Sequence, residues 1–223
     1  MKLYYHPAST TSRIVQLFAL DQGIALDYEV VDLFTGAHLT PEFAKINPSQ
    51  LVPVLEDGDF RLSESAAIIR YLADKAGSAA YPKELKQRAR VNEMMDWFNS
   101  NSYKDFAYGL IYPQAFPHHK RPTDDLQAGT LAWGKQKTEG WLKILDQQLL
   151  GSKKFLCGDS ITLADYMGAE MIALGGLIGC QYSAYPNVER WLGSMRGLKH
   201  WAKVHEAIDG FAASIKGQTF VAI

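Results

Sequence analysis

Apolar and polar positions in the first third of the chain alternate between short strand-like runs and helical spacing. The pattern predicts strands at 3–5, 26–31, 52–55 and 60–62, and helices at 12–22, 41–46 and 63–75. Asp57-Gly58, which separates the last two strands, is a strong signal for a β-hairpin. The resulting order, β α β α β β α, indicates an α/β domain.

The strand pattern ends near residue 76, and a stretch rich in small residues and proline follows at 77–84. Beyond it, apolar residues recur at helical spacing. This spacing predicts helices at 85–108, 123–149, 163–178, 188–195 and 201–215. We therefore expect an α/β domain at 1–76, a linker at 77–84 and an all-helical domain at 85–223.

Composition and charge exclude several classes of protein. The chain has 23 Lys and Arg against 24 Asp and Glu, so its net charge of -1 lacks the basic excess of a nucleic-acid-binding protein. The most apolar stretch, 167–180, is too short to span a bilayer, and the N-terminus has no secretion signal. We therefore expect a cytoplasmic protein that binds neither nucleic acid nor membrane. Two cysteines are too few for a disulfide scaffold or a cysteine-built zinc site.

Four hydroxyl residues follow the first strand, at positions 9–12. One of them could simply cap the next helix, because Ser and Thr are preferred there. Alternatively, a hydroxyl beside free N–H groups at the positive end of a helix could stabilise an anion such as a thiolate or a phosphate. A P-loop is excluded because no Gly-x4-Gly-Lys is present. His6, the nearest histidine, is expected to be a packing residue.

Two further segments offer groups that could hold a small peptide. Pro53, near the start of a strand, suits a sheet edge or a cis turn, and a cis turn would leave the N–H and C=O of Val52 available to an antiparallel ligand. Glu64 and Ser65 open the next helix and could be structural capping residues. They could also meet an ammonium group and a carboxylate. Together the three segments meet the needs of a small zwitterionic peptide that carries a thiol.

Several short motifs occur in the same order along one known family. In the first half they are His6-Pro7-Ala8-Ser9, Ser12-Arg13, Pro41-Glu42-Phe43, Asn47-Pro48, Val52-Pro53, Asp57-Gly58 and Glu64-Ser65-x-Ala67-Ile68. The second half adds 155–159 and 161–165, where Thr162 and Asp165 are predicted to form a capping box stapled by Ile161. The set resembles the serine-type cytosolic glutathione transferases: the theta and delta classes and bacterial dichloromethane dehalogenase. Over about residues 2–200, this resemblance implies a thioredoxin-like α/β domain, an all-helical domain and a homodimer.

The resemblance also implies a role for each polar segment. Ser9 would donate a hydrogen bond to the sulfur of glutathione, the co-substrate, and so favour the nucleophilic thiolate. Its neighbours Thr10, Thr11 and Ser12 remain alternatives for this contact.

The rest of glutathione would be held by its backbone and its charged ends. The implied residues are Val52, before a cis Pro53, for the cysteinyl backbone, Glu64 and Ser65 for the γ-glutamyl ammonium and carboxylate, and His38 and Gln50 for the glycyl carboxylate. Leu51 and Ala66 depart from the family, because some theta members and the delta-type enzymes have basic residues at these two positions. We therefore expect a modest affinity for glutathione.

In this family the electrophile pocket is lined by the loop after the first strand and by the first helix of the second domain with its continuation. The aromatic residues that could line it here are Tyr103, Phe106, Tyr108, Tyr112 and Phe116. An aromatic stripe at helical spacing could equally belong to the core. His118 and His119, flanked by prolines, are expected in a solvated loop rather than in a metal site.

These residues favour an enzyme that conjugates glutathione to, or removes halide from, a small hydrophobic electrophile, with no metal. One alternative is a non-catalytic binding or regulatory protein that keeps the fold, because a fold does not fix a function. Another is a glutathione-dependent peroxidase or thiol-disulfide reductase, which would need a cysteine where Ser9 stands.

Overall fold

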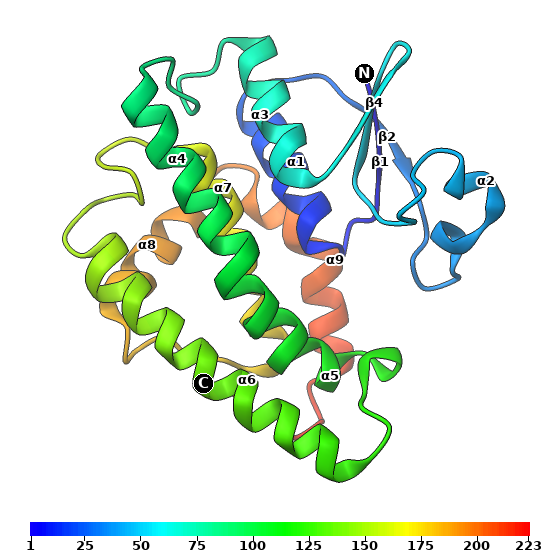
Figure 1. Ribbon diagram of the computed structural model, residues 1–223, viewed down its shortest axis with the longest axis vertical. Coiled ribbons are helices and arrows are strands. Elements are labelled where there is room, and N and C mark those ends of the chain that lie inside the picture. The colour runs from blue at the N-terminus through cyan, green and yellow to red at the C-terminus, as the bar shows by residue number, and fades with distance from the viewer.

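A four-stranded mixed sheet forms the first part of the chain in the computed structural model, which describes residues 1–223 (Figure 1). The strands are β1 (Lys2–Tyr5), β2 (Asp27–Val30), β3 (Val54–Asp57) and β4 (Phe60–Ser63). They lie in the order β2-β1-β3-β4, with β1 parallel to β2 and antiparallel to β3, and with β3 and β4 paired as a hairpin. The predicted strand order along the chain and the Asp57-Gly58 hairpin are therefore confirmed.

Helices cover both faces of this sheet. They are α1 (Thr10–Asp21), α2 (Pro41–Ala44) and α3 (Ser65–Ala76). Side chains alternate across a strand, so Leu3 faces α1 and α3 in the main core, while Tyr4 faces Phe43 of α2 in a second, smaller cluster. The helix α3 ends where Gly77 adopts the left-handed conformation, with φ of 65°.

The second part of the chain is all-helical. Its α-helices are α4 (Leu85–Trp97), α5 (Tyr112–Ala115), α6 (Asp124–Ile144), α7 (Leu163–Ala173), α8 (Pro186–Arg196) and α9 (Trp201–Ser214). Between α4 and α5 the chain continues as π-helix over Phe98–Ser102 and Lys104–Ile111, and α6 continues as π-helix over Leu145–Leu150. Short 3-10 helices span Ala37–Leu39, Pro117–His119 and Leu174–Ile178. None of the helices is both long enough and apolar enough to cross a membrane.

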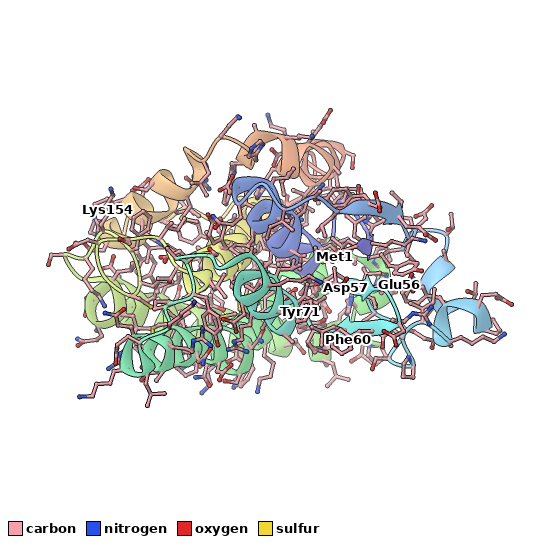
Figure 2. The ribbon with its side chains drawn as sticks, turned by 90° about the horizontal axis from the view of Figure 1, so that it is seen from above. Met1, Glu56, Asp57, Phe60, Tyr71 and Lys154 are labelled. Carbon is pink, nitrogen blue, oxygen red and sulfur yellow. The ribbon has the colours of Figure 1, made fainter.

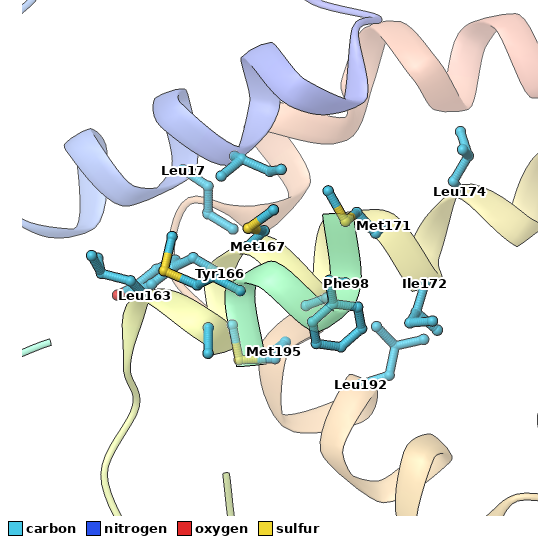
Figure 3. Packing of buried hydrophobic residues seen from close by; sticks show 14 of the residues in the cluster. Leu17, Phe98, Leu163, Tyr166, Met167, Met171, Ile172, Leu174, Leu192 and Met195 are labelled. Atoms are coloured by element: carbon cyan, nitrogen blue, oxygen red, sulfur yellow. The ribbon is translucent and has the colours of Figure 1, made fainter. Parts of the chain in front are cut away.

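The helix α7 is the centre of the main core. Every residue from Leu163 to Ile172 is buried. Figure 3 shows Leu17 of α1 and Leu192 and Met195 of α8 beside the side chains of this helix. The capping box at its start uses both oxygens of Asp165, which accept from the N–H and hydroxyl of Thr162, from Leu156 N and from Trp191 Nε1 at 2.8–2.9 Å. Because α7 also contacts α1, it ties the helical part to the first part.

Two helical backbones touch where the π-helix at 104–111 crosses α6. A Cβ added to Gly134 would lie 2.4 Å from the carbonyl carbon and oxygen of Gly109, and one added to Gly109 would lie 3.2 Å from the Cα of Gly134. The 2.4 Å distances are shorter than real Cβ contacts, so only glycine fits at position 134 without a shift of the backbone. The crossing fixes the helix that carries Tyr103 and Tyr108 against the rest of the helical part.

Candidate functional site

A cavity of about 360 Å³ lies between the two parts of the chain. Its first-part lining comes from the loop after β1, the segment after β2 with the 3-10 helix at 37–39, the turn before β3 and the start of α3. Its second-part lining comes mainly from the helices between residues 99 and 119, with single residues of the 3-10 segment after α7 and of α9. Most of the polar groups come from the first part and most of the aromatic groups from the second. The cavity can therefore hold a polar ligand beside an apolar one.

Ser9 lines the cavity as the N-cap of α1. Its Oγ accepts a hydrogen bond from the backbone N–H of Ser12 at 3.4 Å, and its own N–H donates to His6 O at 3.0 Å. The capping role and a role at the site are therefore compatible in one residue. The first turn of α1 has no acidic side chain, so nothing there opposes the helix dipole's preference for an anion.

The three neighbouring hydroxyls take different positions. Thr10 and Thr11 also line the cavity, whereas Ser12 is buried away from it and accepts from His6 N at 3.4 Å. Thr11 Oγ1 lies 3.1 Å from Ser9 Oγ and donates to the carbonyl oxygen of Val52, also at 3.1 Å.

The turn before β3 presents a free backbone donor. The Val52-Pro53 peptide bond is cis, and both residues line the cavity. The N–H of Val52 donates to no group of the protein, while its carbonyl accepts only from Thr11. Asn47 holds this turn, because its Nδ2 donates to Leu51 O at 2.8 Å. An extended ligand could therefore pair with Val52.

The start of α3 has no side-chain cap. Glu64 precedes the helix with a left-handed φ of 69°, which is strained for a non-glycine residue, and its carboxylate does not cap the first turn. Ser65 is buried and lines the cavity, and its Oγ and N–H have no partner in the protein. A helix N-terminus with free N–H groups is an anion site, and Glu64 beside it can attract a cation.

Of the two residues predicted to bind the glycyl carboxylate, only His38 lines the cavity. His38, in the 3-10 helix at 37–39, lines the cavity and has a buried Nδ1 without a partner. Gln50, with a left-handed φ of 54°, directly precedes the lining residue Leu51 but is not itself a lining residue. His6 is buried as expected and also lines the cavity, and burial lowers the pKa of its imidazole.

Four of the five predicted aromatic residues line the second-part wall: Tyr103, Tyr108, Tyr112 and Phe116. The hydroxyls of Tyr103 and Tyr112 are 2.6 Å apart, and burial raises the pKa of both phenols, so both stay protonated at neutral pH. Phe116 stacks on Phe211 of α9 with ring centroids 5.3 Å apart.

Phe106 corrects the sequence prediction, because it is 1% exposed and packs in the core near Gly175. In an α-helix, Tyr103 and Phe106 would share a face. The segment is instead wound as a π-helix with i→i+5 hydrogen bonds, which brings residues five apart, such as Tyr103 and Tyr108, onto one face.

Several lining residues were not predicted. They are Leu33, Phe34, Asn47, Leu51, Asn99, His118, His119, Leu174 and Ile208. His118 is exposed and His119 is partly exposed, as expected for a solvated segment, but both also border the cavity. Burial, together with His118 and Arg121, lowers the pKa of His119. The hydroxyl run and the aromatic spacing gave signals in the sequence, whereas Phe34, Leu174 and Ile208 come to the cavity only through tertiary packing. No cluster of three or more His, Cys, Asp or Glu side chains has the geometry of a metal site.

A buried ion cluster supports the Ser9 loop from behind. Arg13 Nε lies 2.9 Å from Glu170 Oε2 of α7, and Arg13 Nη1 donates to the carbonyl of Ala8 at 2.7 Å. His205 of α9 places Nε2 3.3 Å from the same carboxylate oxygen, while its Nδ1 faces Trp201 O at 3.0 Å. These three charged or titratable side chains are at most 5% exposed. The cluster therefore joins α1, α7 and α9. Through the bond to the carbonyl of Ala8, it also holds the residue before Ser9 in place.

Comparison with known proteins places both parts in one family. The profile of the glutathione S-transferase N-terminal domain matches residues 3–80, and that of the glutathione S-transferase C-terminal domain matches residues 133–199. Human glutathione S-transferase theta-1 is 33% identical over 194 residues, which are 86% of this chain and 80% of the human protein. Mouse theta-3 is 31% identical over 196 residues, with the same two coverages.

Solved structures agree with these relatives. A delta-class glutathione transferase of Nilaparvata lugens superposes with a TM-score of 0.83 at 34% identity, over 96% of this chain and 98% of its own. Human glutathione transferase theta-2, solved in complex with glutathione, gives a TM-score of 0.84 at 28% identity, over 100% of this chain and 93% of its own. The mixed sheet with its helical partner is thus the glutathione transferase fold. With relatives of theta class at this identity over most of its length, the chain belongs to the glutathione S-transferase family and is a glutathione transferase.

Proposed function

We propose that this glutathione transferase activates the glutathione thiol through the Ser9 hydroxyl and transfers the thiolate to a small hydrophobic electrophile, by conjugation or by displacement of halide. The observation that carries the proposal is the position of Ser9 at the N-terminus of α1, on the wall of a cavity whose other walls offer peptide-binding and aromatic groups. A hydrogen bond from Ser9 to sulfur favours thiolate over thiol, and the thiolate is the nucleophile.

The polar half of the cavity suits glutathione residue by residue. The free N–H of Val52 can donate to the carbonyl of the cysteinyl residue. The uncapped start of α3, with Ser65, can bind the γ-glutamyl carboxylate, and Glu64 can meet its ammonium group. His38 and Gln50 are proposed for the glycyl carboxylate. The cavity binds the co-substrate by local dipoles and few charges, in agreement with the near-zero net charge.

The aromatic half suits the electrophile. Tyr103, Tyr108, Tyr112 and Phe116 present ring surface, and the hydroxyls of Tyr103 and Tyr112 pair with each other. Binding the electrophile there would place its reacting carbon beside the thiolate, so that proximity and the lowered thiol pKa together supply much of the rate gain. Chlorodinitrobenzene and a haloalkane therefore serve as test electrophiles.

The Ser9→Ala variant tests the proposal. Loss of a single donor to a developing or stabilised anion costs about 100-fold in rate, so we expect kcat/KM to fall on that order. The pKa of bound glutathione, followed by thiolate absorbance, should rise towards that of the free thiol. Thr123→Ala is the matched control, because Thr123 caps α6 through an equivalent bond to Leu126 N and lies outside the cavity. Full activity in Ser9→Ala would remove Ser9 from the mechanism.

A homodimer and a cytoplasmic location are also proposed. Phe60, at the tip of the hairpin, is 46% exposed and packs against Tyr71 with ring centroids 5.5 Å apart (Figure 2). Leu85, at the start of α4, is exposed as well. Such apolar side chains support a two-fold contact between copies of the chain. Light scattering should give about twice 24.9 kDa, and a monomer mass would contradict the dimer.

A further inference from the structure

The hydroxyl protons of Ser9 and Thr11 have a defined arrangement in the ligand-free protein. Thr11 Oγ1 lies 3.1 Å from the carbonyl oxygen of Val52 and 3.1 Å from Ser9 Oγ. A carbonyl oxygen only accepts, and a threonine hydroxyl has a single proton. Thr11 therefore donates to Val52, and Ser9 donates to Thr11. Ser9 Oγ accepts from the N–H of Ser12 at the same time.

This arrangement conflicts with donation to a ligand. The one proton that Ser9 could offer to a sulfur atom is directed at Thr11. If Ser9 turned its proton towards the ligand while Thr11 stayed on Val52, the oxygen of Thr11 would lose its donor. If Thr11 instead turned its own proton to Ser9 Oγ, every hydroxyl would keep a partner. In that second arrangement the Val52 carbonyl loses its only protein donor and becomes free for a donor from the ligand.

We infer that Thr11 is a positioning residue that couples peptide binding at Val52 to the orientation of the Ser9 hydroxyl. The ligand feature that operates it is the backbone N–H of a cysteinyl residue, which takes over the carbonyl of Val52. Thr11 then donates to Ser9, and Ser9 donates to the sulfur. Both hydroxyls keep their own protons and only rotate. The chain Thr11–Ser9–sulfur also polarises in one direction, so each hydrogen bond strengthens the next. This inference rests on the proposed function of Ser9.

The Thr11→Val variant keeps the shape of the side chain and removes the hydroxyl. The loss of one hydrogen bond in such a chain corresponds to about a tenfold change. At pH values below the pKa of the bound thiol, we therefore expect kcat/KM for glutathione to fall about tenfold. The apparent pKa of bound glutathione, measured by thiolate absorbance, should rise by about one unit. Thr11→Ser keeps the hydroxyl and should restore both values.

Thr138→Val is the matched control for loss of a threonine hydroxyl. Thr138 is 1% exposed, donates to Gly134 O at 2.7 Å within α6 and does not line the cavity. Its replacement should leave the thiol pKa unchanged, whatever it does to thermal stability. A merely structural effect of Thr11→Val would lower the melting temperature without moving the pKa, and that result would overturn the inference.

The Ser9→Ala/Thr11→Val double variant separates this inference from the proposed function. If Thr11 acts through Ser9, the double variant should match Ser9→Ala in kcat/KM and thiol pKa, and a further loss would overturn the coupling. If Ser9→Ala is impaired while Thr11→Val behaves as wild type, only the coupling fails. If Ser9→Ala is fully active while Thr11→Val is impaired, Thr11 itself contacts the sulfur, and both the proposed role of Ser9 and the coupling are refuted.

Discussion

Replacing Glu170 by glutamine should destabilise this protein by about 3–5 kcal/mol, because it leaves the Arg13 guanidinium buried without its counter-charge. Arg13 is 1% exposed and Glu170 is fully buried, so solvent cannot take over the ion pair. Glutamine has nearly the shape of glutamate, so the loss reports the charge rather than a cavity. Native proteins have free energies of unfolding of about 5–15 kcal/mol, so this change is a large part of the total stability.

Guanidinium chloride unfolding, followed by tryptophan fluorescence at one fixed protein concentration, measures this loss. Arg13→Met/Glu170→Met serves as the comparison, because replacing a buried ion pair by apolar side chains is often neutral or stabilising. We expect the double variant to be more stable than Glu170→Gln. His205, which also faces Glu170, is present in both variants.

Two results would refute this reasoning about the cluster. One is a Glu170→Gln variant within about 1 kcal/mol of wild type, the range of an exposed pair. The other is a double variant less stable than Glu170→Gln. Because Arg13 also holds the carbonyl of Ala8, we further expect KM for glutathione to rise in Glu170→Gln, even at temperatures where the variant stays folded.

Two further predictions concern packing and pH. Gly134→Ala should lower the free energy of unfolding by about 1–3 kcal/mol or more through overpacking, because its Cβ would lie 2.4 Å from the facing backbone. Thermal denaturation should show a lower melting temperature. Gly140→Ala is the control in the same helix, since its Cβ would meet nothing within 4 Å, and it should be neutral or stabilising. Equal melting temperatures for Gly134→Ala and wild type would contradict the close contact. Hydrogen bonds from Lys75 and from Tyr71 lower the pKa of Asp57. Figure 2 labels Asp57 and Tyr71 close to each other. The stability that the Asp57 carboxylate contributes is therefore complete above the usual carboxyl pKa of about 4, and it is lost as the pH falls through the lowered pKa of the folded state. The difference in urea midpoint between wild type and Asp57→Asn should therefore vanish in acid.

The sequence predicted the arrangement of elements better than their internal winding. Period-two and period-3.6 patterns locate strands and helices because burial of one face produces them. They cannot distinguish α from π winding, and Phe106 was therefore assigned to the wrong side of its helix. The free backbone N–H of Val52 could be predicted from Pro53, because a proline restricts the backbone conformation of the residue before it.

Other parts of the site depend on contacts between distant segments. Ile208 and Phe34 reach the cavity from α9 and from the loop after β2, and neither has a local pattern that distinguishes it from an ordinary apolar residue. The hydrogen bond from Thr11 to Val52 joins residues 41 positions apart. The hydroxyl run indicated that some residue at 9–12 would matter, but only the fold shows which hydroxyls share a cavity.

The contact between Gly109 and Gly134 limits how this enzyme can acquire new substrates. The helix that carries Tyr108 cannot move closer to α6, because the backbones of the two helices already touch at Gly109 and Gly134. New specificities should therefore arise by exchange of side chains such as Tyr108 and Phe116, or by changes of length in the proline-bearing loop at 116–123. In a directed-evolution library, Gly134 should remain invariant while these positions diversify.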